Sequence, residues 1–275
     1  MKRARLLLLF IAMISLACAG CAKFDDESAA NLPLKSVNGT GVTNPDTGPN
    51  ISWTEEFNSS SSLAANWTLY GNPQPQWVNS AYGRQGLFDN NGPSPIKNYA
   101  VSHFIAGKGY GFTVESEVLL KILNTQGTCV CPGIGVSSET NPVMKNGEIE
   151  TGISMRIIFA GQKASWLPAK LSGHSWLVMT YLDNNQTIQM SNFILADTYS
   201  NQWIRLKMVI SPTRFVKFYC NNNLIWAPPS QVNAVVTTDK NVVLGYTSDG
   251  DPTNRAGVAY HNWVKVNYFF NNPAD

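Results

Sequence analysis

Glu115 and Glu117 are the residues of this chain whose type and spacing could do chemistry most directly. They lie in segment 112–123, which is long enough to cross a sheet as one strand. Two residues apart on a strand, their carboxyl groups would share one face at about 6–7 Å, a separation that can serve glycoside hydrolysis. The other interpretation is a solvated strand face on which one carboxylate pairs with Lys121.

A second group of candidates consists of aromatic and basic side chains in or beside loops. Trp and Tyr rings stack on the apolar faces of sugars, while arginine binds hydroxyl groups. Arg156 alternates with Met155 and Ile157, so we expect it to point away from the core. The candidate ligand-binding residues are Trp77, Tyr82, Arg84, Arg156, Trp166 and Trp176. For each tryptophan the alternative is a structural role, because most tryptophans of a large sandwich pack in the core or cover an edge.

The sequence holds no arrangement typical of a metal centre or of a histidine-dependent active site. His103, His174 and His261 lie far apart, and we expect each to be structural. The run Asp249-Gly250-Asp251, with Asn254, offers oxygen ligands for calcium, but its spacing does not match a calcium loop and favours a polar turn. We therefore expect no metal and no cofactor, with calcium as the alternative.

Three cysteines lie beyond the N-terminal region, at Cys129, Cys131 and Cys220. Zinc-binding pairs usually have two residues between the cysteines and a matching second pair, and neither is present here. In an oxidising compartment we expect a disulfide from Cys220 to Cys129 or Cys131, which leaves one thiol over. Buried free thiols are the first alternative, and redox chemistry is the second.

The elements that must position these residues are β-strands. In segment 203–210 apolar and polar residues alternate, Pro212 then marks a turn, and strands over 214–220 and 224–226 follow with an asparagine-rich turn between them. This pattern predicts an antiparallel meander. Further strands are expected at 53–57, 67–70, 76–78, 86–89, 99–104, 112–123, 133–137, 152–159, 175–182, 187–194, 242–246 and 257–270. With turn signals every 8–12 residues, they predict an all-β, two-sheet antiparallel sandwich.

Composition agrees with one large β domain, for which we expect residues 52–272 and a monomer. The chain has 275 residues, of which 44% are hydrophobic and only 14% charged. The formal net charge is +2, and no long basic run occurs. A nucleic-acid partner is therefore not expected.

The N-terminus has the pattern of an export signal. Lys2, Arg3 and Arg5 precede an apolar stretch at 6–16 that is short for a membrane span. The following small residues and Cys21 resemble the lipobox of bacterial lipoproteins, which implies cleavage before Cys21 and its acylation. Cys18 is the alternative anchor, because it occupies the place where that motif usually has leucine. An ordinary secretory signal is the other interpretation.

Residues 22–51 are expected to form a flexible tether between the anchor and the domain. The acidic group Asp25-Asp26-Glu27 resembles the surface-export signals of Bacteroidetes lipoproteins. The resemblance implies a lipid-anchored protein of the bacterial outer membrane, on its cell-surface or periplasmic face.

Residues 52–270 resemble the concanavalin A-like lectin/glucanase jelly roll, including laminin G-like modules. The opening Phe, Leu and Trp of that family correspond to Phe57, Leu63 and Trp67. Its closing strand corresponds to 257–263, with His261 where many members have aspartate. The remaining matches are the strands at 112–123 and 133–136, Trp203, Leu206, Leu224, Gly245 and Tyr246.

This resemblance implies a carbohydrate-directed function. Laminarinase-type hydrolases of this fold use Glu-x-Asp-x-x-Glu, but Glu115 and Glu117 are followed by Leu120, and Glu148 and Glu150 by Ile153, where the third acid belongs. We therefore expect recognition of a polysaccharide or oligosaccharide. A glycoside hydrolase or lyase that uses Glu115 and Glu117 is the alternative, and a structural or adhesion lipoprotein that binds a protein is the second alternative.

Overall fold

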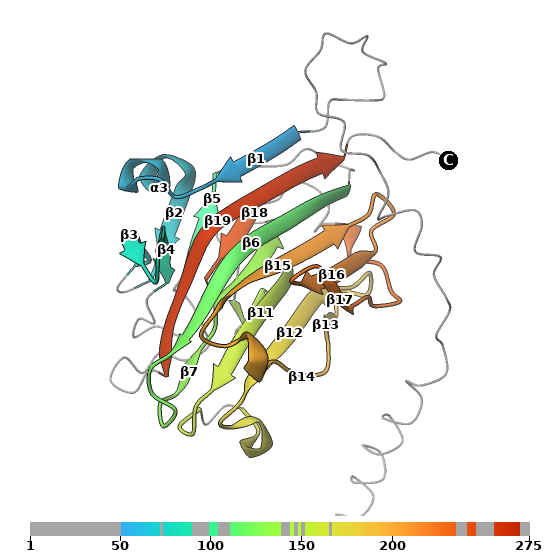
Figure 1. Ribbon diagram of the computed structural model, residues 1–275. Helices are drawn as coiled ribbons and strands as arrows, with labels where there is room; N and C mark the ends of the chain where they lie inside the picture. Colours follow the sequence, from blue (N-terminus) through green and yellow to red (C-terminus); the bar gives the residue numbers. More distant parts are fainter. Residues whose placement is uncertain are drawn as a thin grey trace, which may run out of the picture. The chain divides into compact units, whose positions relative to one another are not determined.

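The computed structural model shows two antiparallel β-sheets that pack face to face, which confirms the predicted all-β jelly-roll sandwich (Figure 1). It describes residues 51–71, 74–89, 99–103, 111–138, 144–145, 148–149, 152–164, 167–234, 241–245 and 256–269. The predicted anchor at Cys21 or Cys18, residues 22–50 of the predicted tether, Trp166 and the Asp249 turn lie outside these residues. Within them, no helix is long and apolar enough to cross a membrane, and no cluster of side chains suits a metal ion.

The first sheet, sheet A, is centred on two long neighbouring strands, β6 and β19, which run side by side in Figure 1. In spatial order its strands are β17 (Asn223–Trp226), β16 (Val216–Cys220), β15 (Trp203–Ile210), β6 (Gly111–Ile122), β19 (Gly257–Phe269), β4 (Arg84–Asp89) and β3 (Gln76–Ala81), and β1 (Ile51–Glu55) also pairs with β19. Every pairing among the described strands of this sheet is antiparallel.

The second sheet, sheet B, lies behind sheet A in Figure 1. In spatial order its strands are β13 (Ile188–Met190), β12 (Ser175–Leu182), β11 (Gly152–Ala160), β8 (Gly133–Ser137), β18 (Asn241–Leu244), β5 (Tyr99–Ser102) and β2 (Trp67–Tyr70), with β14 (Ile194–Leu195) on β12 and β7 (Cys129–Val130) on β11. A separate ribbon pairs β9 (Met144–Lys145) with β10 (Glu148–Ile149). The short helices are α3 (Ser60–Asn66), η1 (Ala169–Leu171) and η2 (Asp197–Tyr199).

The predicted meander is present as β15, β16 and β17. The four inward residues of β15 are at most 1% exposed, as the alternation requires. Asn221 and Asn222 both adopt positive φ, the conformation that asparagine tolerates in a tight turn. One boundary differs, because Arg214 has a φ of 68° and belongs to the preceding turn rather than to the strand.

The strand expected at 187–194 is split into β13 and β14. Both halves pair with β12, but residues 191–193 leave the ladder between them. Ser191 holds this interruption in place: its backbone N–H donates to the Met179 carbonyl at 2.9 Å, and its hydroxyl accepts from the Met179 N–H at 3.1 Å. The Ser191 hydroxyl thus takes the place of a backbone carbonyl as the acceptor of the Met179 N–H. Residues 192 and 193 are then not needed for strand pairing and can turn outward.

The main core lies between the sheets and contains the Phe57, Leu63 and Trp67 framework expected from the sequence. These three are 0%, 4% and 2% exposed, and the Phe57 and Trp67 rings lie 5.8 Å apart. Phe57 has a φ of 49°, and the Glu55 carboxylate accepts its backbone N–H at 2.9 Å. Full burial of an aromatic side chain contributes roughly 2–3 kcal/mol, which offsets the strain of this backbone.

The predicted disulfide of Cys220 with Cys129 or Cys131 is wrong, because Cys220 is a free thiol in the structure. It faces the main core from β16 and is fully buried, so burial raises the pKa of its thiol to about 12. Cys129 and Cys131 belong to a second cluster, with Ile158 and Val178. Since these last two point away from the main core, sheet B separates the cysteine pair from Cys220.

His261 is structural, as expected, and it lies at a β-bulge of β19. The Ser116 hydroxyl donates to the Trp263 carbonyl at 2.6 Å and lies 3.3 Å from His261 Nδ1, so we place the imidazole proton on Nδ1. His261 Nε2 has no hydrogen-bond partner among the described residues. Burial lowers the pKa of His261 to about 3, and the ring is therefore neutral at ordinary pH.

Candidate functional site

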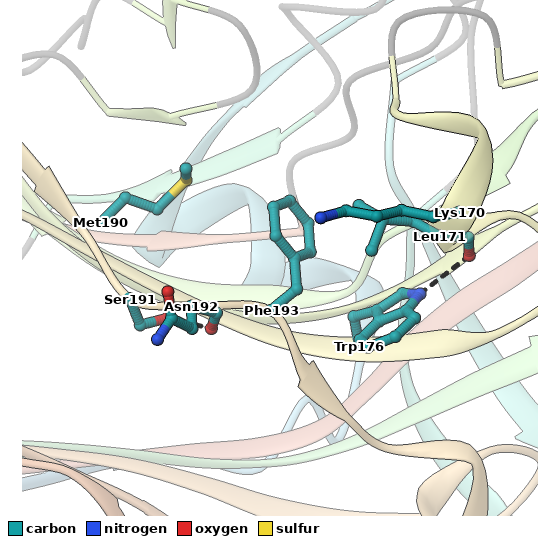
Figure 2. Close-up of a pocket in the computed structure, with 7 residues that line it drawn as sticks. All are labelled: Lys170, Leu171, Trp176, Met190, Ser191, Asn192 and Phe193. Atoms are coloured by element: carbon teal, nitrogen blue, oxygen red, sulfur yellow. Dashed lines mark hydrogen bonds between the residues drawn. The ribbon is translucent and has the colours of Figure 1, made fainter. Parts of the chain in front are cut away.

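A pocket of about 510 Å³ opens where residues 191–193, between β13 and β14, leave the ladder. Its size is that of a small-molecule site. Its walls come from η1, β12, β13 and the 191–193 interruption, and the lining residues are Lys170, Leu171, Trp176, Met190, Ser191, Asn192 and Phe193 (Figure 2). Of these, the sequence singled out only Trp176.

Trp176 is the fixed wall of the pocket. Because Leu177 faces the main core, its neighbour Trp176 must point to the outer side of sheet B. The indole N–H donates to the Leu171 carbonyl at 2.8 Å, drawn as a dashed line in Figure 2. The Phe193 ring meets the indole edge to face, with centroids 6.3 Å apart and planes at 86°. These two contacts hold the half-buried indole in one orientation.

Polar groups lie beside the aromatic wall. Lys170 and Asn192 are exposed, and Figure 2 shows the Lys170 side chain directed toward Phe193. An ammonium group donates hydrogen bonds, whereas an amide both donates and accepts them. Met190, 51% exposed, adds a flexible apolar surface. The pocket therefore suits a ligand that has an apolar face and hydrogen-bonding edges.

A hydrogen-bonded pair that sequence reasoning missed lies next to this wall. His174 Nδ1 is 2.8 Å from an Asp197 carboxylate oxygen, and its ring lies 6.1 Å from that of Trp176. Burial acts to raise the pKa of Asp197, but bonds from the Ser175 N–H and from His174 outweigh it, so that pKa is lowered. Twenty-three positions separate the two residues, and the pairing of β14 with β12 brings them together.

Further along the same outer face, the side chains are polar but buried. Ser154 and Thr180 lie opposite each other on β11 and β12, and their hydroxyls are 2.6 Å apart. Arg156 points away from the main core, as expected, but it is only 2% exposed. Among the described side chains on the strands of sheet B, none is a carboxylate.

Glu115 and Glu117 share one face of their strand, as predicted, but this is the outer face of sheet A. Glu115 is opposite Lys207 on one side and Lys265 on the other. Glu117 is held by Arg84, whose Nε is 3.8 Å from the carboxylate, and by the Asn262 amide at 2.5 Å. The predicted partner Lys121 instead lies over the Tyr82 ring at 5.3 Å.

The structure thus divides the predicted ligand-binding residues among three places. Tyr82 and Arg84 lie on the side of sheet A, at the turn between β3 and β4, while Trp176 and Arg156 lie on sheet B. Trp77 packs against the main core, and its indole donates to the Phe57 carbonyl at 2.5 Å, so its position is that of a framework residue. They do not form one site.

No protein-family model and no curated protein matches this sequence. Similarity to known proteins is found among solved structures. A glycoside hydrolase family 16 endo-glucanase from Bacteroides ovatus, in complex with G4G3G-2F-DNP, is 9% identical, with a TM-score of 0.50 over 78% of this chain and 99% of that one. A GlcNAcα1-4Gal-releasing endo-β-galactosidase from Clostridium perfringens is 12% identical, with a TM-score of 0.51 over 83% and 64%. At these identities the likeness shows the fold, which is that of the jelly-roll glycoside hydrolases.

Proposed function

We propose that this protein binds a carbohydrate, an oligosaccharide or a polysaccharide segment, in the pocket around Trp176. The observation that carries the proposal is the fixed indole wall, because a rigid ring that meets an apolar sugar face loses little conformational entropy on binding. Lys170 and Asn192 line the same pocket and would bind the ring hydroxyls. The fold supports this class of ligand, since the similar structure of the Bacteroides ovatus endo-glucanase is a complex with G4G3G-2F-DNP.

The placement of the carboxylates supports binding over hydrolysis. Glycosidases generally need two carboxyl groups on either side of one bond. Glu115 and Glu117 are on the opposite side of the sandwich from the pocket and are flanked by basic side chains. A hydrolase that uses them would therefore need a second site on sheet A.

We further propose that the domain is a bacterial lipoprotein, held at the outer membrane through Cys21. The basic start, the short apolar stretch and the small residues before Cys21 support this location. Residues 22–51 would give a sugar-binding domain the reach to meet a large glycan.

Binding is tested by affinity electrophoresis on a panel of neutral β-glucans and galactans. Trp176→Ala should abolish the retention that the native protein shows, but it also removes the bond to Leu171. A milder change is Met190→Ala, with Leu224→Ala as its matched control, because both side chains are 51% exposed and only Met190 lines the pocket. Met190→Ala should weaken binding about threefold to tenfold, and Leu224→Ala should not. Equal behaviour of the two variants would reject the pocket.

Hydrolysis is tested on the same glycans by measuring new reducing ends. The proposal expects none. Reducing sugar that appears with the native protein and disappears in Glu117→Gln would replace it by the hydrolase assignment.

The anchor is tested by detergent phase partition of the protein expressed with its N-terminus intact. Cys21→Ser should move it to the aqueous phase, while Cys18→Ser should leave it in the detergent phase. The reverse result would assign the anchor to Cys18.

A further inference from the structure

The outer face of sheet A carries side chains in cross-strand rows. In the row nearest the β3–β4 turn, Leu119 is between Trp203 and Tyr260. The next row places Glu117 between Arg205 and Trp263, and the third places Glu115 between Lys207 and Lys265. We call these three rows the row surface. Rows are about 6.6–6.8 Å apart along the strands, and neighbouring strands are about 4.8 Å apart.

An aromatic cluster forms one end of the row surface. Leu119 points outward, yet it is only 1% exposed. The Trp203 and Tyr260 rings lie 6.5 Å apart, and Tyr82 meets Tyr260 edge to face at 5.5 Å. The Trp203 indole also donates to the Tyr82 carbonyl at 3.3 Å. The cluster is therefore a rigid aromatic edge, with the Tyr82 ring still 51% exposed.

Positive charge dominates the rest of the row surface and its borders. The outward cations on the strands of sheet A are Arg84, Lys121, Arg205, Lys207, Lys217 and Lys265, whereas the outward carboxylates among the described side chains of these strands are Glu115 and Glu117. The whole chain has a formal net charge of only +2, so this face is more basic than the average surface. Aromatic rings contact three of the cations, with Lys121 5.3 Å from Tyr82, Arg205 5.9 Å from Trp263 and Lys207 5.7 Å from Tyr219.

We propose that the row surface is a second binding site, for an anionic polysaccharide that carries uronate or sulfate groups. The rows of cations can pair with acidic groups that repeat along a polysaccharide chain. The exposed Tyr82 ring offers a stacking surface for one sugar. An acidic protein would use the charges but would have no need of the ring. This site is on the other side of the sandwich from the Trp176 pocket, and it does not depend on sugar binding there.

The test measures binding of polygalacturonate and of dextran sulfate, each beside a neutral polymer of the same backbone, methyl-esterified pectin and dextran. We expect the native protein to bind at least one acidic polymer and neither neutral one through this face. Affinity should fall about tenfold between 50 and 200 mM NaCl, because exposed charges are screened by salt. Binding to polygalacturonate alone assigns uronate, and binding to dextran sulfate alone assigns sulfate. Binding to neither would overturn the proposal.

Two variants locate the site. Arg205→Gln with Lys207→Gln should weaken acidic-polymer binding about tenfold, because the double change removes two of the outward positive charges of the row surface. Tyr82→Asn removes the ring but keeps a residue that tolerates the 52° φ, and it should weaken binding about fivefold. Lys163→Gln is the charge control, since Lys163 is exposed in the loop after β11 and lies off sheet A.

The pattern of losses separates the alternatives. Unchanged binding in Tyr82→Asn, together with equal binding of polyglutamate, would overturn the proposal in favour of an acidic protein partner. Loss of acidic-polymer binding in Met190→Ala would show that the acidic polymer binds in the Trp176 pocket and not on the row surface. Met190→Ala and Leu224→Ala could bind neutral glycans equally well while the row-surface variants lose acidic-polymer binding. That result would reject only the function proposed for the pocket.

Discussion

The two outer faces of this sandwich follow the same alternation of side chains but treat polar residues in opposite ways. On sheet A the outward charges are partly exposed, and Arg84 keeps 51% of its side-chain surface accessible while it pairs with Glu117. On sheet B the outward Ser154, Arg156 and Thr180 are at most 2% exposed.

This difference in exposure determines which polar residues the stability of the fold depends on. A buried hydroxyl or guanidinium must keep its hydrogen bonds, because an unmatched one costs about 1–3 kcal/mol. An exposed ion pair contributes about 0–1 kcal/mol and can be replaced. The exposed polar residues on the outer face of sheet A can therefore form a binding surface at little cost in stability. On sheet B the residues available for ligand binding are those at the edge between β13 and β14.

The largest predicted effect compares one glycine on each side. A Cβ at Gly161 would come within 2.1 Å of the Gly127 carbonyl oxygen, whereas a Cβ at Gly83 would meet nothing within 4 Å. Gly161→Ala should lower the free energy of unfolding by about 3–5 kcal/mol. Gly83→Ala, at a φ of 78°, should cost only about 1 kcal/mol. Urea unfolding checks both, and equal losses would refute the difference in packing.

Between the faces, His261 should make stability depend on pH. Its pKa is about 3 in the folded state, where burial disfavours the charge, against an ordinary value of 6.5. The unfolded chain therefore binds the proton first as the pH falls. Stability should drop from pH 6.5 toward pH 3 by up to about 1.4 kcal/mol per unit. Unfolding midpoints at several pH values should show a flatter profile in His261→Leu, and identical profiles would contradict this role.

A smaller effect is expected from the buried hydroxyl pair. Ser154→Ala leaves the Thr180 hydroxyl, 1% exposed, without its described partner, at a cost of about 1–2 kcal/mol. Adding Thr180→Val should restore part of that loss, since both polar groups are then gone. Glu115→Gln on sheet A should change stability by no more than about 0.5 kcal/mol. A Glu115→Gln effect as large as that of Ser154→Ala would remove the contrast between the faces.

The smallest effect concerns Asp197 beside the pocket. Its lowered pKa means that the charged form is favoured in the folded state, a stability present above pH 3.8 and lost as the pH falls through the folded pKa. Asp197→Asn keeps an acceptor for the Ser175 N–H but removes the charge. Because the pair is about half exposed, we expect Asp197→Asn to lose at most about 1 kcal/mol at pH 7, and this difference from the native protein should shrink as the pH falls through the folded pKa of Asp197. A larger loss would assign the pair a buried structural role.

The sequence was informative wherever a local pattern has one structural outcome. Alternation in segments 203–210 and 112–123 predicted both strands and the shared face of Glu115 and Glu117. The Phe57, Leu63 and Trp67 framework was also recognisable. Of the pocket, however, the sequence predicted one residue, because Lys170, Asn192 and Phe193 lie on segments without any regular period.

The disulfide prediction failed for a related reason. Cysteine counting carries no information about which side of a sheet each thiol faces, and β16 directs Cys220 into the main core. In the same way, no local signal marks the interruption at Ser191. It depends on the Met179 backbone of a neighbouring strand twelve residues earlier.

The sequence by itself determined the all-β class, most strands and which residues of each strand share a face, because a strand's side-chain period is fixed by its own backbone. Only the tertiary structure decided which sheet each strand joins. That assignment placed Trp176 on one side of the sandwich and Tyr82, Arg84 and Glu117 on the other. The physical reason is that pairing between distant strands is set by burial of whole faces at once, which no single segment encodes.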